Sequence, residues 1–350
     1  MKSKYILKKY HIFLYMLFLL FQIGCDGKAT EQQKIDTVVS EIKIGLTVYR
    51  RDDTFIAMIV SDMEEAVKEA EQKNNIKIVM NTMDAKGSQI VQNDHIDKLI
   101  EQGCDVLCVN LVDRTVAATV IDKAKAADIP VVFFNREPVK EDLERWNKVY
   151  YVGADASESG KLEGQIVVEQ YNKNNNIDKN RDGKLQYVVL EGEQGHQDAL
   201  LRTEYAVKTI TEAGIQMDKL AGDTANWLRS QAETKMNQWL QIYDDEIELV
   251  LCNNDDMALG AIDAYENIDK TLPAIVGIDG IAPAIEAMQQ GKLLGTVKND
   301  AEMQSELIFE LSYRLAMKED ISKSMNLVRG KYIFTRYTIL KPNNDILNEQ

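Results

Sequence analysis

The stretch DVLCVNLVDRTVAATVIDKAKAADIPVVFFN, residues 105–135, places two short apolar runs on either side of a helical pattern. The runs VLCV and VVFF carry no charge, whereas the segment between them spaces its apolar residues along one face of a helix. Uninterrupted apolar runs of this length are typical of strands in a parallel sheet that is covered by helices on both faces. The stretch therefore predicts a strand–helix–strand unit of an α/β protein.

The same alternation continues along the chain in both directions from this stretch. It begins with IKIGLTVY (42–49) and continues to AIVGID (274–279) and LLGTVKN (293–299). The strands are too many for one small sheet, and 350 residues are enough for two ordinary domains. We therefore predict an α/β fold with two doubly wound parallel sheets.

Several predicted strands end in a polar residue that carries an amide or a carboxylate. These strand ends are Asn110, Asn135, Asn254, Asp279 and Asn299. Ligands of open α/β sheets bind at the carboxyl ends of the strands. Amides and carboxylates pair well with hydroxyl groups, which both donate and accept hydrogen bonds. The sequence contains neither a GxGxxG nor a GxxxxGK[ST] phosphate-binding motif, so a polyhydroxylated ligand is favoured over a nucleotide.

The composition indicates a globular protein with an acidic surface. The formal net charge is −15, with 41 basic and 56 acidic residues. A nucleic-acid partner requires a basic surface, so we expect none. Cys108 and Cys252 lie inside apolar runs and are expected to be buried thiols.

The N-terminus reads as an export signal rather than as part of the fold. A basic segment precedes the short apolar run IFLYMLFLLF (12–21), and Gly24–Cys25 follows. Gly24–Cys25 resembles a bacterial lipoprotein box, although Gln22 replaces the usual leucine. We predict a signal peptide over 1–24, lipidation at Cys25 and a polar tether over 25–40. An ordinary secretory signal with an incidental cysteine is the alternative.

The segment DKNRDGKLQ, residues 178–186, has the spacing of a calcium loop that stops early. Asp178, Asn180 and Asp182 occupy loop positions 1, 3 and 5, and Gly183 occupies position 6. Position 12 of an EF-hand is a bidentate glutamate, but this chain has Val189 there. Either the site is incomplete, or its last carboxylate comes from a distant part of the chain.

Several blocks of the chain resemble the periplasmic D-galactose/D-glucose-binding proteins, the substrate-binding components of ABC sugar importers. The blocks include IGLTVYRRDDTF (44–55), IPVVFFNREP (129–138), EGEQGHQDALLRT (191–203) and IELVLCNNDDMALGA (247–261). The resemblance extends from about Ile42 to near Asp345. It implies the type I periplasmic binding protein fold, in which two lobes are joined by a three-strand hinge.

The resemblance also implies lobe boundaries and a sugar site. The N-terminal lobe would contain 41–130 plus 299–334, and the C-terminal lobe 131–298 plus 335–350, with crossings near 131, 299 and 335. The implied sugar-binding residues are Asp53, Phe55, Asn110, His196, Asp198, Arg202, Trp227, Asn254, Asp279 and Asn299. Phe55 and Trp227 would stack on the two faces of the sugar, and Asp198 would lie near the anomeric hydroxyl. Gln197 stands where the family has proline.

The family pattern also implies a structural Ca²⁺ whose last ligand comes from a later strand. That ligand would be Glu248, with Glu246 as the local alternative. The implied ligands are Asp178, Asn180, Asp182, the Lys184 carbonyl, Gln186 and Glu248.

The resemblance implies a binding protein and not an enzyme. It would carry D-galactose or D-glucose to an ABC transporter permease from the outer face of the cell membrane or the periplasm. A sugar-sensing lipoprotein that reports to a chemoreceptor or membrane kinase is the alternative. A glycosidase would need two carboxylates on either side of a glycosidic bond. A sugar-responsive repressor would need a helix-turn-helix head, and the N-terminus resembles a signal peptide instead.

Overall fold

The structure is a computed structural model that describes residues 41–174 and 177–342. All of them fall within one compact unit, residues 40–350. The predicted signal peptide (1–24), tether (25–40) and lipidation site Cys25 lie outside the described residues. Within the described part of the chain, no helix combines the length and hydropathy needed to cross a bilayer.

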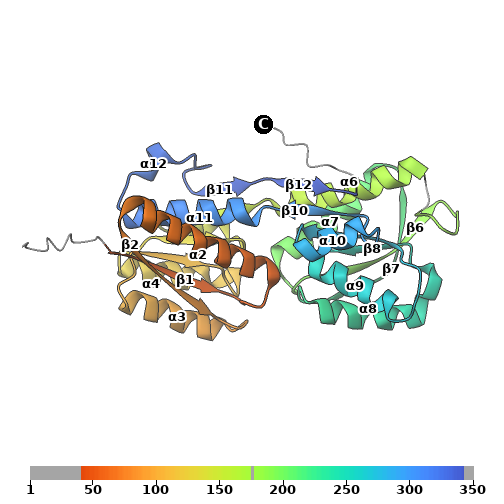
Figure 1. Ribbon diagram of the computed structural model, residues 1–350, viewed down its shortest axis with the longest axis horizontal. Helices are drawn as coiled ribbons and strands as arrows, with labels where there is room; N and C mark the ends of the chain where they lie inside the picture. Colours follow the sequence, from red (N-terminus) through yellow and green to blue (C-terminus); the bar gives the residue numbers. More distant parts are fainter. Residues whose placement is uncertain (1–40, 175–176, 343–350) are drawn as a thin grey trace, which may run out of the picture. The chain divides into compact units, whose positions relative to one another are not determined.

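Six strands form the first sheet, in the spatial order β11-β5-β4-β3-β1-β2. Figure 1 labels β1, β2 and β11 of this sheet. They are β1 (Glu41–Val48), β2 (Lys77–Asp84), β3 (Val106–Val109), β4 (Val131–Phe134), β5 (Val149–Ala154) and β11 (Tyr332–Thr335). All neighbouring strands of this sheet pair in parallel. Val106 and Cys108 pack into the core on one face, whereas Leu107 and Val109 pack on the other. The run VLCV is apolar throughout because both faces of β3 are buried.

Helices cover both faces of the first sheet. They are α2 (Thr54–Asn74), α3 (Gln89–Glu101), the 3-10 helix η1 (Arg114–Val116), α4 (Ala117–Ala126), α5 (Lys140–Leu143), α11 (Ala301–Ala316) and α12 (Ile321–Ser324). Helices α2 and α11 share a core with Val106, to which α11 contributes Ile308 and Leu311. Helices α3 and α4 form the core on the Leu107 face. The predicted α/β layering is therefore confirmed.

Six strands also form the second sheet, in the order β12-β10-β9-β8-β6-β7. They are β6 (Lys184–Glu191), β7 (Gln216–Thr224), β8 (Leu249–Cys252), β9 (Ala274–Asp279), β10 (Gly295–Asn299) and β12 (Tyr337–Leu340). Its helices are α6 (Ala156–Asn174), α7 (Gln197–Glu212), α8 (Arg229–Tyr243), η2 (Asp244–Glu246), α9 (Asp255–Glu266) and α10 (Ala282–Gln289). Strand β12 pairs antiparallel with β10, and the other neighbours pair in parallel.

The chain passes between the two sheets three times, at 154–156, 299–301 and 335–337. The crossing predicted near residue 131 is wrong, because β4 and β5 both belong to the first sheet. Leu107 of β3 pairs with Val131 of β4, and β5 pairs with both β4 and β11. The first lobe therefore extends to Ala154, and the second lobe begins with α6.

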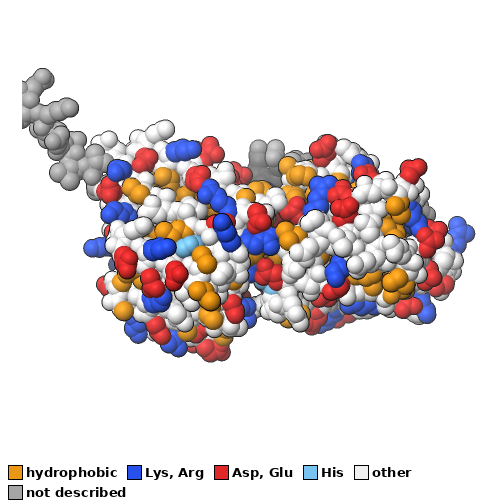
Figure 2. Space-filling view, turned by 90° about the horizontal axis from the view of Figure 1, so that it is seen from below, with side chains coloured by type: hydrophobic (Ala, Val, Ile, Leu, Met, Phe, Trp, Pro, Cys, Tyr) orange, Lys and Arg blue, Asp and Glu red, His pale blue; other side chains and the backbone are white. Residues whose placement is uncertain are grey.

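The described cysteines are unpaired thiols, and the surface charges of both signs are mixed. Cys104, Cys108 and Cys252 are free and buried, so a bridge between Cys104 and Cys108 is absent. Acidic and basic side chains are interspersed over the face shown in Figure 2. This face carries neither a wholly basic nor a wholly acidic surface.

Candidate functional site

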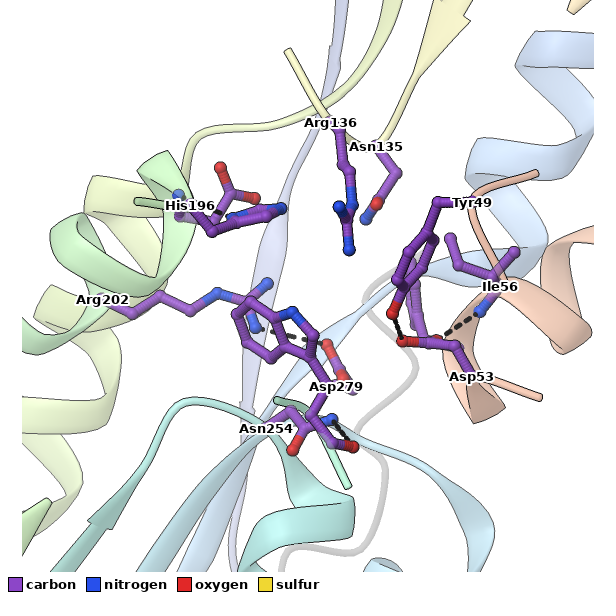
Figure 3. A pocket seen from close by; sticks show the side chains of 12 residues that line it. Tyr49, Asp53, Ile56, Asn135, Arg136, His196, Arg202, Asn254 and Asp279 are labelled. Carbon is purple, nitrogen blue, oxygen red and sulfur yellow. Dashed lines mark hydrogen bonds and ion pairs between the residues drawn. The ribbon is translucent and has the colours of Figure 1, made fainter. Parts of the chain in front are cut away.

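A polar cavity lies between the two lobes at the carboxyl ends of several strands (Figure 3). Its lining residues are Tyr49, Asp53, Phe55, Ile56, Asn135, Arg136, His196, Asp198, Arg202, Trp227, Asn254 and Asp279. The first lobe contributes Tyr49, Asp53, Phe55, Ile56, Asn135 and Arg136, and the second lobe contributes the others. The cavity volume is about 30 Å³. That figure is the volume open to the centres of water molecules; the space between the lining atoms, including the part open to solvent, is about 360 Å³.

The first lobe presents Tyr49 and Asp53 from the turn between β1 and α2. Asp53 is the N-cap of α2, where its carboxylate accepts a hydrogen bond from the Ile56 N–H at 2.9 Å. The Tyr49 hydroxyl also donates to this carboxylate. The capping role fixes the direction of Asp53 and places the next residue but one, Phe55, in the first turn of the helix.

The second lobe presents His196, Asp198 and Arg202 from the start of α7. His196 is the N-cap of α7, and its Nδ1 accepts a hydrogen bond from the Asp198 N–H at 3.2 Å. Arg202 donates from Nη1 to the Asn253 carbonyl at 2.6 Å. The same Nη1 lies 3.7 Å from Oδ1 of Asp279. Arg202 and Asp279 therefore form a buried pair of opposite charge at one wall of the cavity.

Trp227 forms the apolar wall of the second lobe. Its ring lies edge-on to His196, with 5.2 Å between the ring centroids. The Asn254 amide caps α9 by accepting from the Met257 N–H at 3.0 Å, and it donates to the Trp227 carbonyl at 3.4 Å. Gly192 leaves room for the indole, because a Cβ at this position would lie 2.1 Å from the ring carbon Cζ2.

Three non-glycine residues in the cavity wall have a left-handed backbone. The φ angles are 59° at Asn135, 65° at Trp227 and 124° at Asp279. Such conformations cost on the order of 1–3 kcal/mol each and concentrate at functional sites. Their occurrence at three lining residues supports a ligand-binding role for this cavity.

Burial changes the protonation of the cavity residues. Burial raises the pKa of Asp198, although Arg202 and Arg136 favour its charged form. Burial also raises the pKa of Asp279 well above its ordinary value, against the opposing effect of Arg202. Burial lowers the pKa of His196 well below its ordinary value, and the nearby arginines lower it further. His196 is therefore neutral, and the cavity can both donate hydrogen bonds to hydroxyl groups and accept them.

The cavity contains eight of the ten residues predicted for the sugar site, and the structure places the other two elsewhere. Asn110 is buried, where its amide accepts from the Tyr49 N–H at 3.3 Å and donates to Oδ1 of Asn135 at 3.1 Å. Asn299 is also buried, and it accepts from Nε2 of Gln304 at 2.6 Å. Asn110 therefore holds two lining residues in place, whereas Asn299 lies in the hinge region.

Four lining residues were not in the predicted site: Tyr49, Ile56, Asn135 and Arg136. A signal for Asn135 exists in the sequence, because it is one of the five polar strand ends. Tyr49 and Arg136 follow strand ends by one or two residues. The rule that ligands bind where parallel strands end could have found both.

The structure brings the predicted calcium residues together. Glu248 is 1% exposed, and its Oε1 accepts from the N–H groups of Lys179 at 2.6 Å and Asn180 at 3.1 Å. Its Oε2 accepts from the Gln186 N–H at 3.2 Å. Asp182 and Gln186 also contact each other, with 2.8 Å between Oδ2 and Nε2.

The residue types of this loop fit a hard cation, but its carboxylate side chains are not grouped closely enough in the described residues to hold one by themselves. Asp178, Asp182 and Glu248 form no ion pair with any described residue. Within the described ranges, no group of three or more His, Cys, Asp and Glu side chains is arranged to hold a metal ion. The predicted set also uses Asn180, Gln186 and a backbone carbonyl, which are oxygen ligands suited to Ca²⁺.

Two α/β lobes that share a polar cavity and are linked by three chain crossings define a two-lobed ligand-binding protein. The family model described as a periplasmic binding protein domain matches residues 44–320. The chain therefore belongs to the periplasmic binding protein family. The family resemblance predicted from the sequence is confirmed.

Curated relatives and solved structures agree with this assignment. The chain is 40% identical over 275 residues to the D-galactose/methyl-galactoside binding periplasmic protein of Haemophilus influenzae, covering 78% of this chain and 81% of that protein. It is 28% identical over 307 residues to a xylitol-binding protein of Mycolicibacterium smegmatis, covering 88% and 79%. An ABC transporter solute binding protein from Bacillus halodurans with bound myo-inositol matches with a TM-score of 0.74 and 26% identity, covering 87% and 96%.

Proposed function

We propose that this protein binds D-galactose or D-glucose between its lobes and delivers it to the permease of an ABC importer. One observation carries the proposal: Phe55 and Trp227 come from opposite lobes and line one cavity together with carboxylates, two amides and two guanidinium groups. A pyranose has two faces with apolar C–H groups and a rim of hydroxyl groups. Aromatic rings bury the faces, and the polar groups pair with the rim.

Sugar selectivity follows from the buried polar groups of the cavity. Asp53, Asp279 and Arg202 are each held by a protein partner, so their directions are fixed before a ligand arrives. An epimer that misplaces one hydroxyl leaves such a group unpaired, at a cost of about 1–3 kcal/mol. The 40% identity to a galactose-binding relative supports a hexose of this kind as the ligand.

Transport requires that the sugar enters an open form and is held in a closed form. The crossings at 154–156, 299–301 and 335–337 are the positions about which the lobes would rotate. A sugar that contacts both lobes favours the closed form over the open one, which the permease would then recognise. Export through the N-terminal signal and anchoring through Cys25 would place the protein at the outer face of the membrane.

The same cavity would also serve a sensory lipoprotein that reports to a chemoreceptor or membrane kinase. Catalysis is not part of the proposal, because Asp53 and Asp198 are assigned to hydroxyl recognition. Prolonged incubation with galactose and galactosides, followed by product analysis, tests this assignment. Formation of any product would contradict a binding-only role.

We also propose a structural Ca²⁺ in the second lobe, held by Asp178, Asn180, Asp182, the Lys184 carbonyl, Gln186 and Glu248. The support is the burial of Glu248 against the loop that carries the other five residues. The cation would supply positive charge among three carboxylates and join the loop to the start of β8. It would stabilise the lobe by binding only the folded state.

Isothermal titration calorimetry of the mature protein with galactose, glucose, ribose and xylose tests the sugar assignment. We expect at least one hexose to bind and both pentoses to bind more weakly. Asp279→Ala should weaken hexose binding at least tenfold, since it removes a fixed partner of a hydroxyl. Asp97→Asn is the control, because Asp97 lies on α3 outside the cavity and pairs with Lys123. Binding of a pentose without either hexose would contradict the proposal.

A further inference from the structure

Arg136 occupies a central position in the cavity, although it was not among the predicted site residues. It follows β4, is 4% exposed, and points between Tyr49 and His196 in Figure 3. Its guanidinium lies over the Tyr49 ring, 3.5 Å from the ring centroid. Its Nη1 donates to the Val112 carbonyl at 2.9 Å. Stacking and hydrogen bonding together fix the side chain on the wall of the first lobe.

Glu193, from the loop between β6 and α7, meets Arg136 across the lobes. The Nη2 of Arg136 lies 3.0 Å from Oε1 of Glu193, and Nη1 lies 2.9 Å from Oε2. Two parallel N–H to oxygen contacts of this kind fix both the distance and the orientation of the pair. The arginine is buried, so separating the pair leaves a charge without its partner at a substantial cost.

A second, larger cavity lies on the other side of this ion pair. Its volume is about 410 Å³, and it shares Arg136, His196 and Asp198 with the first cavity. Glu193 lines only the larger cavity. The Arg136–Glu193 pair therefore forms a wall between the two spaces. His196 and Asp198 also line both spaces, so removal of the pair would open part of this wall.

The larger cavity has the polarity of a site for hydroxyl groups. Arg114, Glu137 and Gln194 belong to its lining. A second contact between the lobes borders it, since Nε2 of Gln197 donates to Oε2 of Glu137 at 3.3 Å. Hydrogen-bond donors and acceptors are thus both available for a second sugar ring.

We propose that Arg136, held by Glu193, determines ligand size: the closed form accepts one hexose and rejects galactosides that carry a second sugar ring. The second ring would have to occupy the larger cavity, and the ion pair blocks the path to it. This inference rests on the proposed function, because it assumes that a hexose occupies the first cavity.

Calorimetric titration with galactose, lactose and melibiose tests the inference, since the two disaccharides carry galactose in β and α linkage. The mature protein should bind both disaccharides about 100-fold or more weakly than galactose, because binding requires the ion pair to separate. In Arg136→Ala and Glu193→Ala, the ratio of the disaccharide Kd to the galactose Kd should fall to about tenfold or less for at least one disaccharide. Arg145→Gln is the matched control, since Arg145 is exposed, pairs with Asp122 and lines neither cavity, and it should leave this ratio at the value of the unmodified protein.

The ratio separates selectivity from a general loss of affinity. The inference is overturned if the unmodified protein binds a disaccharide within tenfold of galactose, or if the variants keep the original ratio. Glu193→Gln preserves the shape of the side chain and serves as the deciding variant if Arg136→Ala does not fold. Failure of the unmodified protein to bind galactose or glucose would instead refute the proposed function.

Discussion

Replacing Glu248 by glutamine should remove the calcium dependence of stability. The substitution should lower stability in two ways, one independent of calcium and one that depends on it. Glutamine keeps one carbonyl oxygen, which can still accept from the N–H groups of Lys179 and Asn180. Its NH₂ group would then face the Gln186 N–H, which the second carboxylate oxygen satisfies in the unmodified protein. One buried donor left unpaired lowers the free energy of unfolding by about 1–3 kcal/mol, with or without calcium.

The second part of the effect depends on the metal concentration. Calcium at about 100 times its dissociation constant stabilises the folded state by about 2.7 kcal/mol. For a lobe of this size, that stabilisation raises Tm by roughly 5–10 °C. The unmodified protein should therefore melt about 5–10 °C higher in 1 mM CaCl₂ than in EGTA, provided the site binds in the micromolar range. Glu248→Gln should show the same Tm in both buffers.

Differential scanning calorimetry of three chains in both buffers measures these effects. Glu246→Gln is the matched control, because Glu246 is exposed in η2, two residues before Glu248. Glu246→Gln should keep the full increase in Tm between EGTA and 1 mM CaCl₂. The reasoning is refuted if Glu248→Gln retains the increment, if Glu246→Gln loses it, or if the unmodified protein shows none.

Three further substitutions test the cavity and the core. Gly192→Ala should weaken hexose binding at least tenfold by displacing the Trp227 ring, measured by calorimetry; unchanged affinity would contradict the close contact. Trp227→Ala should weaken hexose binding roughly tenfold or more, whereas Trp239→Phe, outside the cavity, should not. Burial raises the pKa of Glu163 well above its ordinary value of 4.5. The protonated side chain therefore contributes its full stability below pH 4.5, and this contribution is lost as pH rises through the folded-state pKa. Glu163→Gln should flatten the fall of Tm above pH 4.5, and an unchanged pH profile would contradict this assignment.

Local sequence patterns could predict much of the fold and the site. Apolar runs such as VLCV predicted buried strands because β3 is covered on both faces. Asp53 was implied by the family resemblance, and Asn254 also by its place near a strand end; each caps a helix in the structure, which fixes the direction of its side chain. His196 has the same capping role at α7.

The features that could not be predicted depend on which strands become neighbours. The run VVFF has the same pattern whether it joins the first or the second sheet, so the crossing near 131 was misplaced. Arg136 gains its role from the Tyr49 ring and from Glu193, which lies 57 residues away in sequence. Asn299 ends its strand as Asp279 does, but the side chain of Asn299 is bound by Gln304 in the hinge region.

The three chain crossings also affect the order in which the lobes can fold during synthesis. The second lobe is complete except for the edge strand β12 once residue 299 has been made. The first lobe is encoded earlier, but it lacks α11, whose Ile308 and Leu311 fill one of its two cores, until residue 316. The apolar face formed by β1, β3 and α2 therefore stays uncovered while the whole second lobe is being synthesised. A chain that stops between 299 and 316 would leave one lobe nearly native and the other prone to aggregate.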